Sequence, residues 1–198
     1  MRLCSYVVKN DKGLAPNPFW GYCTLALCTP NHMGIKAEKG DWFVGNSSVA
    51  KGNKLIFAMQ VEEILSFYQY YNDPRFKRKK PDKNGTWRRQ CGDNMYFKDK
   101  RGKWKQHPSQ FHNTPKDRKK DLKNPFVYIS KRFYYFGEHA GSLPGRYGEL
   151  ILKRQGCKCS HDTEIVNGFL KWLQKKYKPG IYGKPQDILG EHCFGAKF

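Results

Sequence analysis

The sequence predicts an α+β fold, with a mostly antiparallel β-sheet or small barrel, a few helices and one basic insertion. Short β-prone runs separated by turn residues fill the first 71 residues and resume after residue 124. The clearest helical pattern comes near the C-terminus, at about 163–178. Regular alternation of strands and helices is missing, which argues against a doubly wound parallel sheet. With 198 residues, the chain has the length of one domain, covering residues 1–198.

The N-terminal region is expected to consist of strands joined by turns. Its strand-like segments are residues 2–8, 19–28, 40–49 and 54–65. They combine β-branched, aromatic and other apolar residues, and Gly, Pro or Asn residues separate them. A short helix is predicted from residue 66, and it should end before Pro74, because the residue that precedes a proline avoids the helical conformation.

The C-terminal region resumes the strand pattern and then becomes helical. Residues 125–136 predict a strand and its continuation, and residues 146–154 predict a further strand. In the helix at 163–178, apolar residues recur at helical spacing and lysines gather at the C-terminal end. Asp162 or Thr163 can cap its N-terminus, and a Pro-Gly pair follows it.

A basic insertion is expected at about 75–123. It contains 18 Lys and Arg against five Asp and Glu, a net charge of +13 within the chain total of +20. Aliphatic residues nearly vanish there but aromatic residues remain, which is unlike a disordered tail and predicts an ordered or partly ordered segment. So large an excess of positive charge repels itself unless a polyanion is nearby. Nucleic acid is therefore the expected partner, and an anionic membrane is the weaker alternative, because no basic amphipathic helix is visible.

The seven cysteines suit reduced thiols in a cytoplasm better than a disulfide framework, because their number is odd and their spacing is irregular. Cys4, Cys23 and Cys28 also lie in apolar, strand-like runs. The N-terminus becomes polar after eight residues, too early for a secretory signal, and no apolar run is long enough to span a membrane. These features predict a cytoplasmic protein.

The sequence contains no phosphate-binding glycine loop, dinucleotide fingerprint, zinc-protease motif or nucleophile elbow, so no cofactor and no metal are expected. Cys157, Cys159 and His161 have side chains that bind zinc, and they form the alternative to this expectation. One residue between paired ligands is tighter than the usual spacing of roughly two to four. A polar turn before the helix is therefore the preferred interpretation.

A Cys-Gly-Asp-Asn segment in the middle of the chain allows two interpretations. In the first, Cys91 is a nucleophile, because nearby cations favour a thiolate, and Asp93 and His112 are further catalytic candidates. In the second, the segment is a turn in which Gly92 allows a positive φ, and Asp93 and Asn94 bond the local backbone. Such a turn can also present an Asp or Asn side chain to the edge of a base. Nothing in the sequence brings a histidine to the cysteine, so we favour the turn, and a binding protein over an enzyme.

Aromatic residues cluster beside polar ones at several places. Most of these rings are expected in the core, but rings beside Asn, Ser, Asp and Arg also hold unstacked bases. The candidates for a base pocket are Trp20, Tyr22, Trp42, Asn46, Ser47, Asp73 and Asn94. Dense basic runs grip phosphate without reading sequence. The candidates for contacts to the nucleic-acid backbone are Arg75, Lys77, Arg78, Lys79, Lys80, Arg88, Arg89, Lys119 and Lys120.

Five blocks of the sequence together resemble the nucleotide modification associated domain family, second subtype. In chain order they are YVVKNDKGLAPNPFWGYCTLALCTP, GDWFVGNSS, LIFAMQVEEILSFYQYYNDPRF, CGDNMYF and FVYISKRFYYFG. They run from about Ser5 to Gly137, and the rest of the chain matches less clearly. The resemblance implies a protein of a bacterial cell or a phage-infected host that acts beside enzymes that modify bases in DNA. Such enzymes are therefore candidate partners.

The second and third blocks are also similar to the PUA-like superfamily, which includes the EVE, ASCH and YTH domains. In those domains a Gly-Asp turn leads into one barrel strand, and an aromatic pocket holds a flipped or modified base. Carried over by position, this resemblance points to Trp42, Asn46 and Ser47 as pocket residues, with Trp20 and Tyr22 as candidates for the wall. The Cys-Gly-Asp-Asn segment has no counterpart there, so it is either a pocket element of the subtype or a catalytic addition.

The leading hypothesis is a nucleic-acid-binding module that recognises a modified or extruded base, in DNA rather than RNA. The basic insertion grips phosphate and the aromatic pocket selects the base. The alternative is an enzyme that acts on a base or nucleotide in a DNA-modification pathway. A second alternative is a phage or defence factor that binds a small nucleotide.

Overall fold

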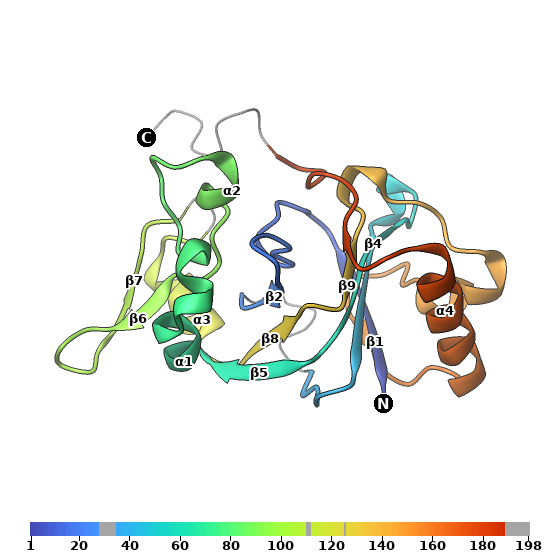
Figure 1. The fold of residues 1–198 in the computed structure, drawn as a ribbon, viewed down its shortest axis with the longest axis horizontal. Helices are drawn as coiled ribbons and strands as arrows, with labels where there is room; N and C mark the ends of the chain where they lie inside the picture. Colours follow the sequence, from blue (N-terminus) through green and yellow to red (C-terminus); the bar gives the residue numbers. More distant parts are fainter. Residues whose placement is uncertain (28–34, 110–111, 125, 189–198) are drawn as a thin grey trace.

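Two β-sheets form the centre of the fold (Figure 1). The computed structural model describes residues 1–27, 35–109, 112–124 and 126–188. Within them, one sheet has the strand order β10-β1-β3-β4-β9-β11, a second has the order β2-β8-β5, and β6 and β7 form a separate hairpin. The strands are β1 Leu3–Val8, β2 Cys23–Leu25, β3 Trp42–Ser47, β4 Leu55–Gln60, β5 Glu63–Ser66, β6 Tyr96–Lys98, β7 Trp104–Gln106, β8 Phe126–Ser130, β9 Phe133–Tyr135, β10 Cys157–Lys158 and β11 Gly180–Ile181.

Short helices connect these strands, and one longer helix lies near the C-terminus. The α-helices are α1 Phe67–Asn72, α2 Trp87–Gln90, α3 Pro115–Asp121 and α4 Thr163–Lys176, and the 3-10 helices are η1 Val49–Lys51, η2 Pro74–Lys79, η3 Gly137–His139 and η4 Gly145–Leu150. The predicted α+β class is confirmed. Antiparallel pairs outnumber parallel ones, as predicted, but β1 runs parallel to β3, and β11 runs parallel to β9.

Two chain segments, β4–β5 and β8–β9, each bend and pass from one sheet to the other. β4 lies in the larger sheet and continues as β5 in the smaller one, and β8 and β9 make the reverse transition. Two backbone hydrogen bonds lie across the bend. The amide of Gln60 donates to the carbonyl of Arg132 (3.0 Å), and the amide of Glu62 donates to the carbonyl of Ile129 (3.0 Å). The two sheets therefore share one continuous antiparallel ribbon.

The main hydrophobic core draws on both sheets. It includes Phe43 of β3, Phe57 of β4 and Tyr128 of β8, which are all buried. α4 packs against the larger sheet (Figure 1) and contributes Phe169 and Leu173 to the same core. The core therefore depends on segments that lie more than 100 residues apart in the chain.

α4 begins at the cap that the sequence predicts. The carboxylate of Asp162 accepts hydrogen bonds from the amides of Glu164 (2.8 Å) and Ile165 (3.0 Å). These bonds satisfy amide groups that have no partner within the first turn of a helix.

The basic insertion packs on a second core that it shares with the smaller sheet. Phe76 and Tyr96 are fully buried there, together with Phe67 of α1 and Val127 of β8. The rings of Phe67 and Tyr96 meet edge to face, with their centres 5.5 Å apart. Figure 1 shows α1, α2, α3 and the β6–β7 hairpin together at the opposite end of the molecule from α4. The described part of the insertion is therefore a folded region with aromatic packing.

The predicted strand at 146–154 is wrong. Gly145–Leu150 forms η4 instead, and its period of about three residues per turn brings both Tyr147 and Leu150 onto the core. The hydroxyl of Tyr147 also donates to the carbonyl of Gly168 in α4 (2.9 Å).

The strand predicted at 19–28 is shorter than expected. Trp20 and Gly21 have positive φ angles of 64° and 79°, so they form a turn, and β2 begins only at Cys23. A positive φ is uncommon for a bulky residue such as tryptophan, and it is not visible in a pattern of apolar residues. Residue 28, the end of the predicted strand, lies outside the described residues.

Cys4 and Cys159 form a disulfide, which corrects the expectation that Cys4 is a reduced thiol. β1 and β10 pair with Ser5 opposite Lys158, so the two cysteines face each other, and their Cα atoms lie 4.1 Å apart. The bond also removes Cys159 from the zinc alternative. Of the other cysteines, Cys23 and Cys91 are buried thiols, Cys157 is an exposed thiol, and Cys28 and Cys193 lie outside the described residues.

None of the helices in the described residues is both long and apolar enough to cross a membrane.

Candidate nucleic-acid interface

The Cys-Gly-Asp-Asn segment is a buried connection. Cys91, Asp93 and Asn94 are at most 1% exposed. The carboxylate of Asp93 accepts hydrogen bonds from the hydroxyls of Thr24 (2.5 Å) and Tyr70 (2.7 Å). The side-chain amide of Asn94 donates to the carbonyl of Tyr70 (3.0 Å). These contacts favour the turn interpretation, and the burial corrects the prediction of Asn94 as a residue of an open base pocket.

Gly92 is needed in this segment for close packing. A Cβ atom at this position would lie 2.5 Å from the carbonyl oxygen of Lys79 and 2.5 Å from the nitrogen of Pro81. Gly92 is not among the described glycines with a positive φ, so the conformational reason that the sequence suggested is wrong.

We expect Gly92→Ala to lower the free energy of unfolding by about 1–3 kcal/mol, because an added methyl group would overpack against backbone atoms that cannot rotate away. Urea unfolding followed by tryptophan fluorescence measures this loss. Gly148→Ala is the matched control, since a Cβ atom at Gly148 would meet no other atom within 4 Å. Equal losses in the two variants would contradict the packing argument.

Lys79 is the centre of a buried polar cluster beside this segment, and it is 1% exposed. Its ammonium group donates to the carbonyl and side-chain oxygens of Asn17 (2.9 and 2.7 Å), the carbonyl of Tyr22 (2.9 Å) and the hydroxyl of Thr24 (3.0 Å). Burial lowers the pKa of Lys79 to about 8 and raises the pKa of Asp93. Lys79 therefore joins η2 to the loop between β1 and β2, residues 9–22, which we call the N-terminal loop. The prediction that Lys79 contacts phosphate is wrong, because its ammonium group is buried.

The catalytic candidates do not form one constellation in the described contacts. Nδ1 of His112 lies 2.6 Å from the carboxylate of Asp121, which also accepts a hydrogen bond from the hydroxyl of Tyr96 (2.6 Å). Cys91 instead packs with Phe19 in a small apolar cluster. A nucleophile needs a base within hydrogen-bonding reach, so these contacts give no support to the catalytic hypothesis.

The pocket residues carried over from the PUA-like resemblance lie within the larger sheet. Trp42, Asn46 and Ser47 belong to β3 and are at most 1% exposed. Nδ2 of Asn46 donates to the carbonyls of Ser47 (2.8 Å) and Leu152 (2.9 Å), and its side-chain oxygen accepts from the amide of Leu152 (3.1 Å). The structure corrects their prediction as pocket residues, because these side chains serve the packing and hydrogen bonding of the sheet.

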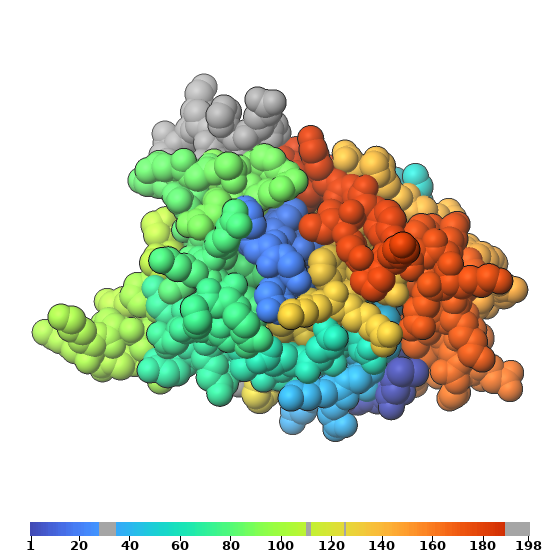
Figure 2. All heavy atoms as spheres, in the orientation of Figure 1, coloured from blue at the N-terminus to red at the C-terminus, as the bar shows by residue number. Residues whose placement is uncertain are grey.

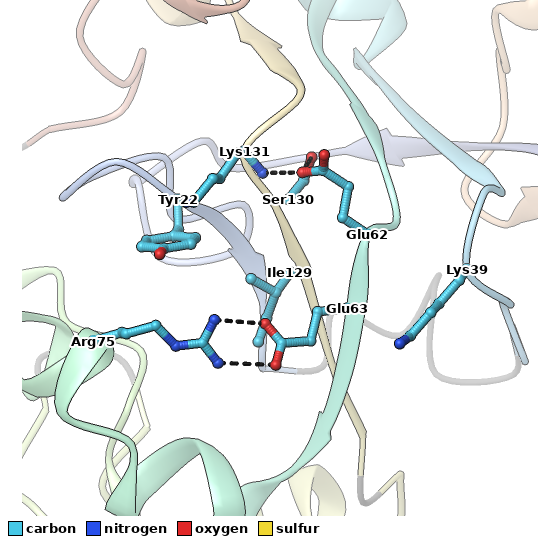
Figure 3. A pocket seen from close by; sticks show the side chains of 8 residues that line it. All are labelled: Tyr22, Lys39, Glu62, Glu63, Arg75, Ile129, Ser130 and Lys131. Atoms are coloured by element: carbon cyan, nitrogen blue, oxygen red, sulfur yellow. Dashed lines mark hydrogen bonds and ion pairs between the residues drawn. The ribbon is translucent and has the colours of Figure 1, made fainter.

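A pocket of about 290 Å³ opens beside Tyr22 (Figure 3). Its walls come from the N-terminal loop, the turn before β3, η2, β5, β8 and the bend between the sheets. The lining residues are Tyr22, Lys39, Glu62, Glu63, Arg75, Ile129, Ser130 and Lys131. Figure 3 shows the ring of Tyr22 between the side chains of Lys131 and Arg75. Tyr22 and Arg75 are the predicted site residues that the structure brings together here.

Arg75 is held by two carboxylates at this pocket. Nη1 and Nη2 donate to the two oxygens of Glu63 (2.9 Å each), while Nε and Nη2 donate to Asp73 (2.9 and 2.6 Å). The hydrogen bonds from Arg75 lower the pKa of Asp73. The group formed by one guanidinium and two carboxylates carries no net positive charge. The structure therefore corrects Arg75 from a phosphate contact to a part of the pocket wall, and Asp73 from a pocket residue to the partner that orients it.

Several cations lie over aromatic rings that are only partly buried. Around the N-terminal loop, the guanidinium carbon of Arg78 is 3.8 Å from the ring centre of Trp20, and the ammonium nitrogen of Lys131 is 5.2 Å from that of Tyr22. Two further pairs lie within the insertion, and they join Arg88 to Trp87 (5.3 Å) and Lys98 to Trp104 (5.3 Å). A third pair joins Lys80 of the insertion to Tyr71 of α1 (3.5 Å). Cations therefore contact rings both within one segment and between segments that lie far apart in the sequence.

The N-terminal loop is accessible on this side of the molecule. Figure 2 shows the loop (blue) at the surface, between the region of η2 and α2 (green) and the C-terminal segment (red). Lys77 on η2 is exposed, and so are Lys119 and Lys120 on α3, which lies behind α1 in the view of Figure 1. Arg89 is partly buried, and its Nη2 atom lies 3.5 Å from Oδ2 of Asp82.

Sequence reasoning missed six of the eight pocket residues, and four of these six are charged, namely Lys39, Glu62, Glu63 and Lys131. A signal for three of them was present. The Val-Glu-Glu and Ser-Lys-Arg runs interrupt apolar segments that were predicted as single strands, and charged residues within an apolar strand indicate a bend or an exposed edge. Their meeting in one pocket follows from the bend between the two sheets.

A family model described as nucleotide modification associated domain 2 matches residues 1–192. No curated protein and no solved structure matches the chain. The PUA-like resemblance therefore stays a prediction. The family model includes the C-terminal region, where the resemblance of individual sequence blocks is weak. The chain belongs to the nucleotide modification associated domain 2 family, whose name associates it with nucleotide modification.

Proposed function

We propose that this protein is a nucleic-acid-binding module that recognises a modified or extruded base in DNA. The observation that carries the proposal is the set of cations in contact with partly exposed aromatic rings, at the pocket beside Tyr22 and along the insertion. A ring face stacks with a base of any identity, and a neighbouring cation attracts the phosphate of the same strand.

The distribution of charge supports the proposal. The chain carries a formal charge of +20, and the insertion contributes +13 of it. Lys79 is buried and Arg75 is neutralised, so neither is available to phosphate. The remaining predicted candidates for phosphate contacts are Lys77, Arg78, Lys80, Arg88, Arg89, Lys119 and Lys120, and the structure adds Lys131 beside Tyr22.

The family name supports the choice of nucleotide chemistry as the context. We extend it to DNA and to base-modification enzymes as partners, as the resemblance of the sequence blocks implies. The catalytic alternative has weaker support, because Cys91 and Asp93 are enclosed and hydrogen-bonded or packed within the fold.

Binding to DNA should weaken steeply with salt. If about six phosphates are neutralised, affinity should fall about 10³-fold between about 50 and 200 mM salt, because the protein releases condensed counterions. Fluorescence anisotropy with a labelled duplex that contains one unpaired base measures the slope of log K against log[salt].

A slope near zero would contradict the proposal, since it would mean that the charge serves solubility alone. Competition by free mononucleotides as effective as that by DNA would favour the small-nucleotide alternative instead. Tighter binding to one modified base than to its unmodified counterpart would support a reader of that modification.

A further inference from the structure

We propose that the pocket beside Tyr22 accepts a single nucleotide whose base presents an amino group, and that the carboxylate of Glu63 accepts a hydrogen bond from that group. The inference rests on the proposed function, because nucleic acid must first bind this face of the protein. It adds the chemical class of base that the pocket selects.

The dimensions of the pocket suit one base. Its volume of about 290 Å³ lies just below the range of roughly 300–1,000 Å³ that is usual for small-molecule sites, as suits a ligand as small as one base. Tyr22 supplies an aromatic wall, and the ring is held in place edge to face by buried Phe76, with the ring centres 5.1 Å apart. A fixed ring is a better stacking surface than a mobile one, since less side-chain entropy is lost on binding.

Acidic groups distinguish this pocket from the basic surface around it. Glu63 is 30% exposed on its side chain, and each of its carboxylate oxygens accepts one hydrogen bond from Arg75. An ionised carboxylate has about four acceptor positions, so Glu63 retains acceptor capacity toward the pocket. It has no hydrogen to donate. A base edge with an amino group satisfies such an acceptor, whereas a keto oxygen at the same place meets a negative charge.

Glu62 lines the same pocket, but its carboxylate binds backbone amides of the protein. One of its carboxylate oxygens accepts hydrogen bonds from the backbone amides of Lys131 and Arg132, the latter at 3.0 Å. These bonds hold the turn between β8 and β9, which carries the side chain of Lys131 over Tyr22. Lys131 and Lys39 are exposed and both line the pocket, where they suit the phosphate of the bound nucleotide. Glu62 is therefore a positioning residue, and Glu63 is the residue that meets the base.

The test compares two duplexes that differ only at one unpaired residue, deoxycytidine or deoxyuridine. Their rings have the same shape, and an amino group in the first replaces a keto oxygen in the second. We expect the wild-type protein to bind the deoxycytidine duplex about tenfold more tightly, with the same salt slope for both. Glu63→Gln should bring this ratio close to one, because an amide presents a donor as well as an acceptor.

Lys77→Ala is the matched control, because Lys77 is exposed on the same 3-10 helix as Arg75 and does not line the pocket. It should weaken binding of both duplexes equally and leave their ratio unchanged. Equal affinity of the wild-type protein for both duplexes, with a steep salt slope, would overturn the pocket inference and leave the proposed function standing. A flat salt slope would overturn the proposed function as well. The wild-type comparison holds even if Glu63→Gln fails to fold.

Discussion

Replacing Lys79 with methionine should lower the free energy of unfolding by about 3–5 kcal/mol, because removing one partner of a buried ionic cluster leaves the other groups uncompensated. Methionine retains much of the apolar stem but has no ammonium group. Oxygens of Asn17, Tyr22 and Thr24 then lose their donor, and Asp93 loses the nearby positive charge that lowers its pKa. Chemical denaturation followed by tryptophan fluorescence measures the loss.

Lys77→Met provides the control, because Lys77 lies two residues earlier on η2 and is exposed. Its effect should stay within about 0.5 kcal/mol. The double variant Lys79→Met/Asp93→Asn should recover part of the loss, since it also removes the carboxylate that lost its counter-charge. Similar losses for Lys77→Met and Lys79→Met would show that the buried cluster contributes nothing specific.

The effect of Lys79 should also depend on pH. Burial lowers the pKa of Lys79 from 10.5 to about 8, so between these values the unfolded chain binds more protons than the folded one. Stability from this group therefore rises with pH across that window, and below about pH 8 the cost of burying the charge is fully present. The difference in stability between the wild-type protein and Lys79→Met should widen from about pH 7.5 to about pH 9.5. If the stability difference between the two proteins narrows as the pH rises, the lowered pKa of Lys79 is contradicted.

Removing the disulfide should be the other large effect on stability. Cys4 and Cys159 are 155 residues apart in sequence, and a cross-link that closes so long a loop restricts the unfolded chain strongly. We expect Cys159→Ala to cost about 2–5 kcal/mol, measured by urea unfolding without a reductant. A reductant should lower the stability of the wild-type protein toward that of the variant and leave the variant unchanged.

Cys157→Ala is the matched control for this variant. Cys157 is an exposed thiol two residues away, at the start of the short strand β10 that Cys159 follows. Its replacement should change stability by less than about 0.5 kcal/mol. If the wild-type protein is insensitive to reductant, and Cys159→Ala behaves like Cys157→Ala, then the cross-link does not stabilise the fold.

The regular elements were predictable where the local pattern decides the structure. β1 and β3 follow from runs of apolar and β-prone residues bounded by turns. α4 follows from helical spacing and from the cap at Asp162. The failure at 146–154 has a physical reason, since the apolar residues of this run suggested a strand, whereas the three-residue spacing of Tyr147 and Leu150 puts both on one side of a 3-10 turn that packs against α4.

The sequence indicated that the candidate site combines aromatic rings with cations, but it indicated only some of the residues that form the site. Tyr22 and Arg78, which the sequence names as site residues, lie where rings contact cations, and their roles toward nucleic acid stay predictions. Trp42 lies in the core instead, and the sequence did not reveal this, because the residues of a strand that is buried on both faces show no alternation that separates a ring in the core from a ring that lines a pocket. Glu63 was missed because its importance comes from Arg75, a residue on another element.

The amino-acid sequence by itself determined the α+β class, the concentration of positive charge between residues 75 and 123, and the family, since all three depend on composition or on the local order of residues. The tertiary structure alone decided which of several equivalent side chains is buried. Lys77 and Lys79 have identical chemistry and stand two residues apart, yet one is exposed and the other is enclosed. The difference arises because the N-terminal loop, some 60 residues earlier in the chain, folds back and places the oxygens of Asn17 and Tyr22 around one ammonium group only.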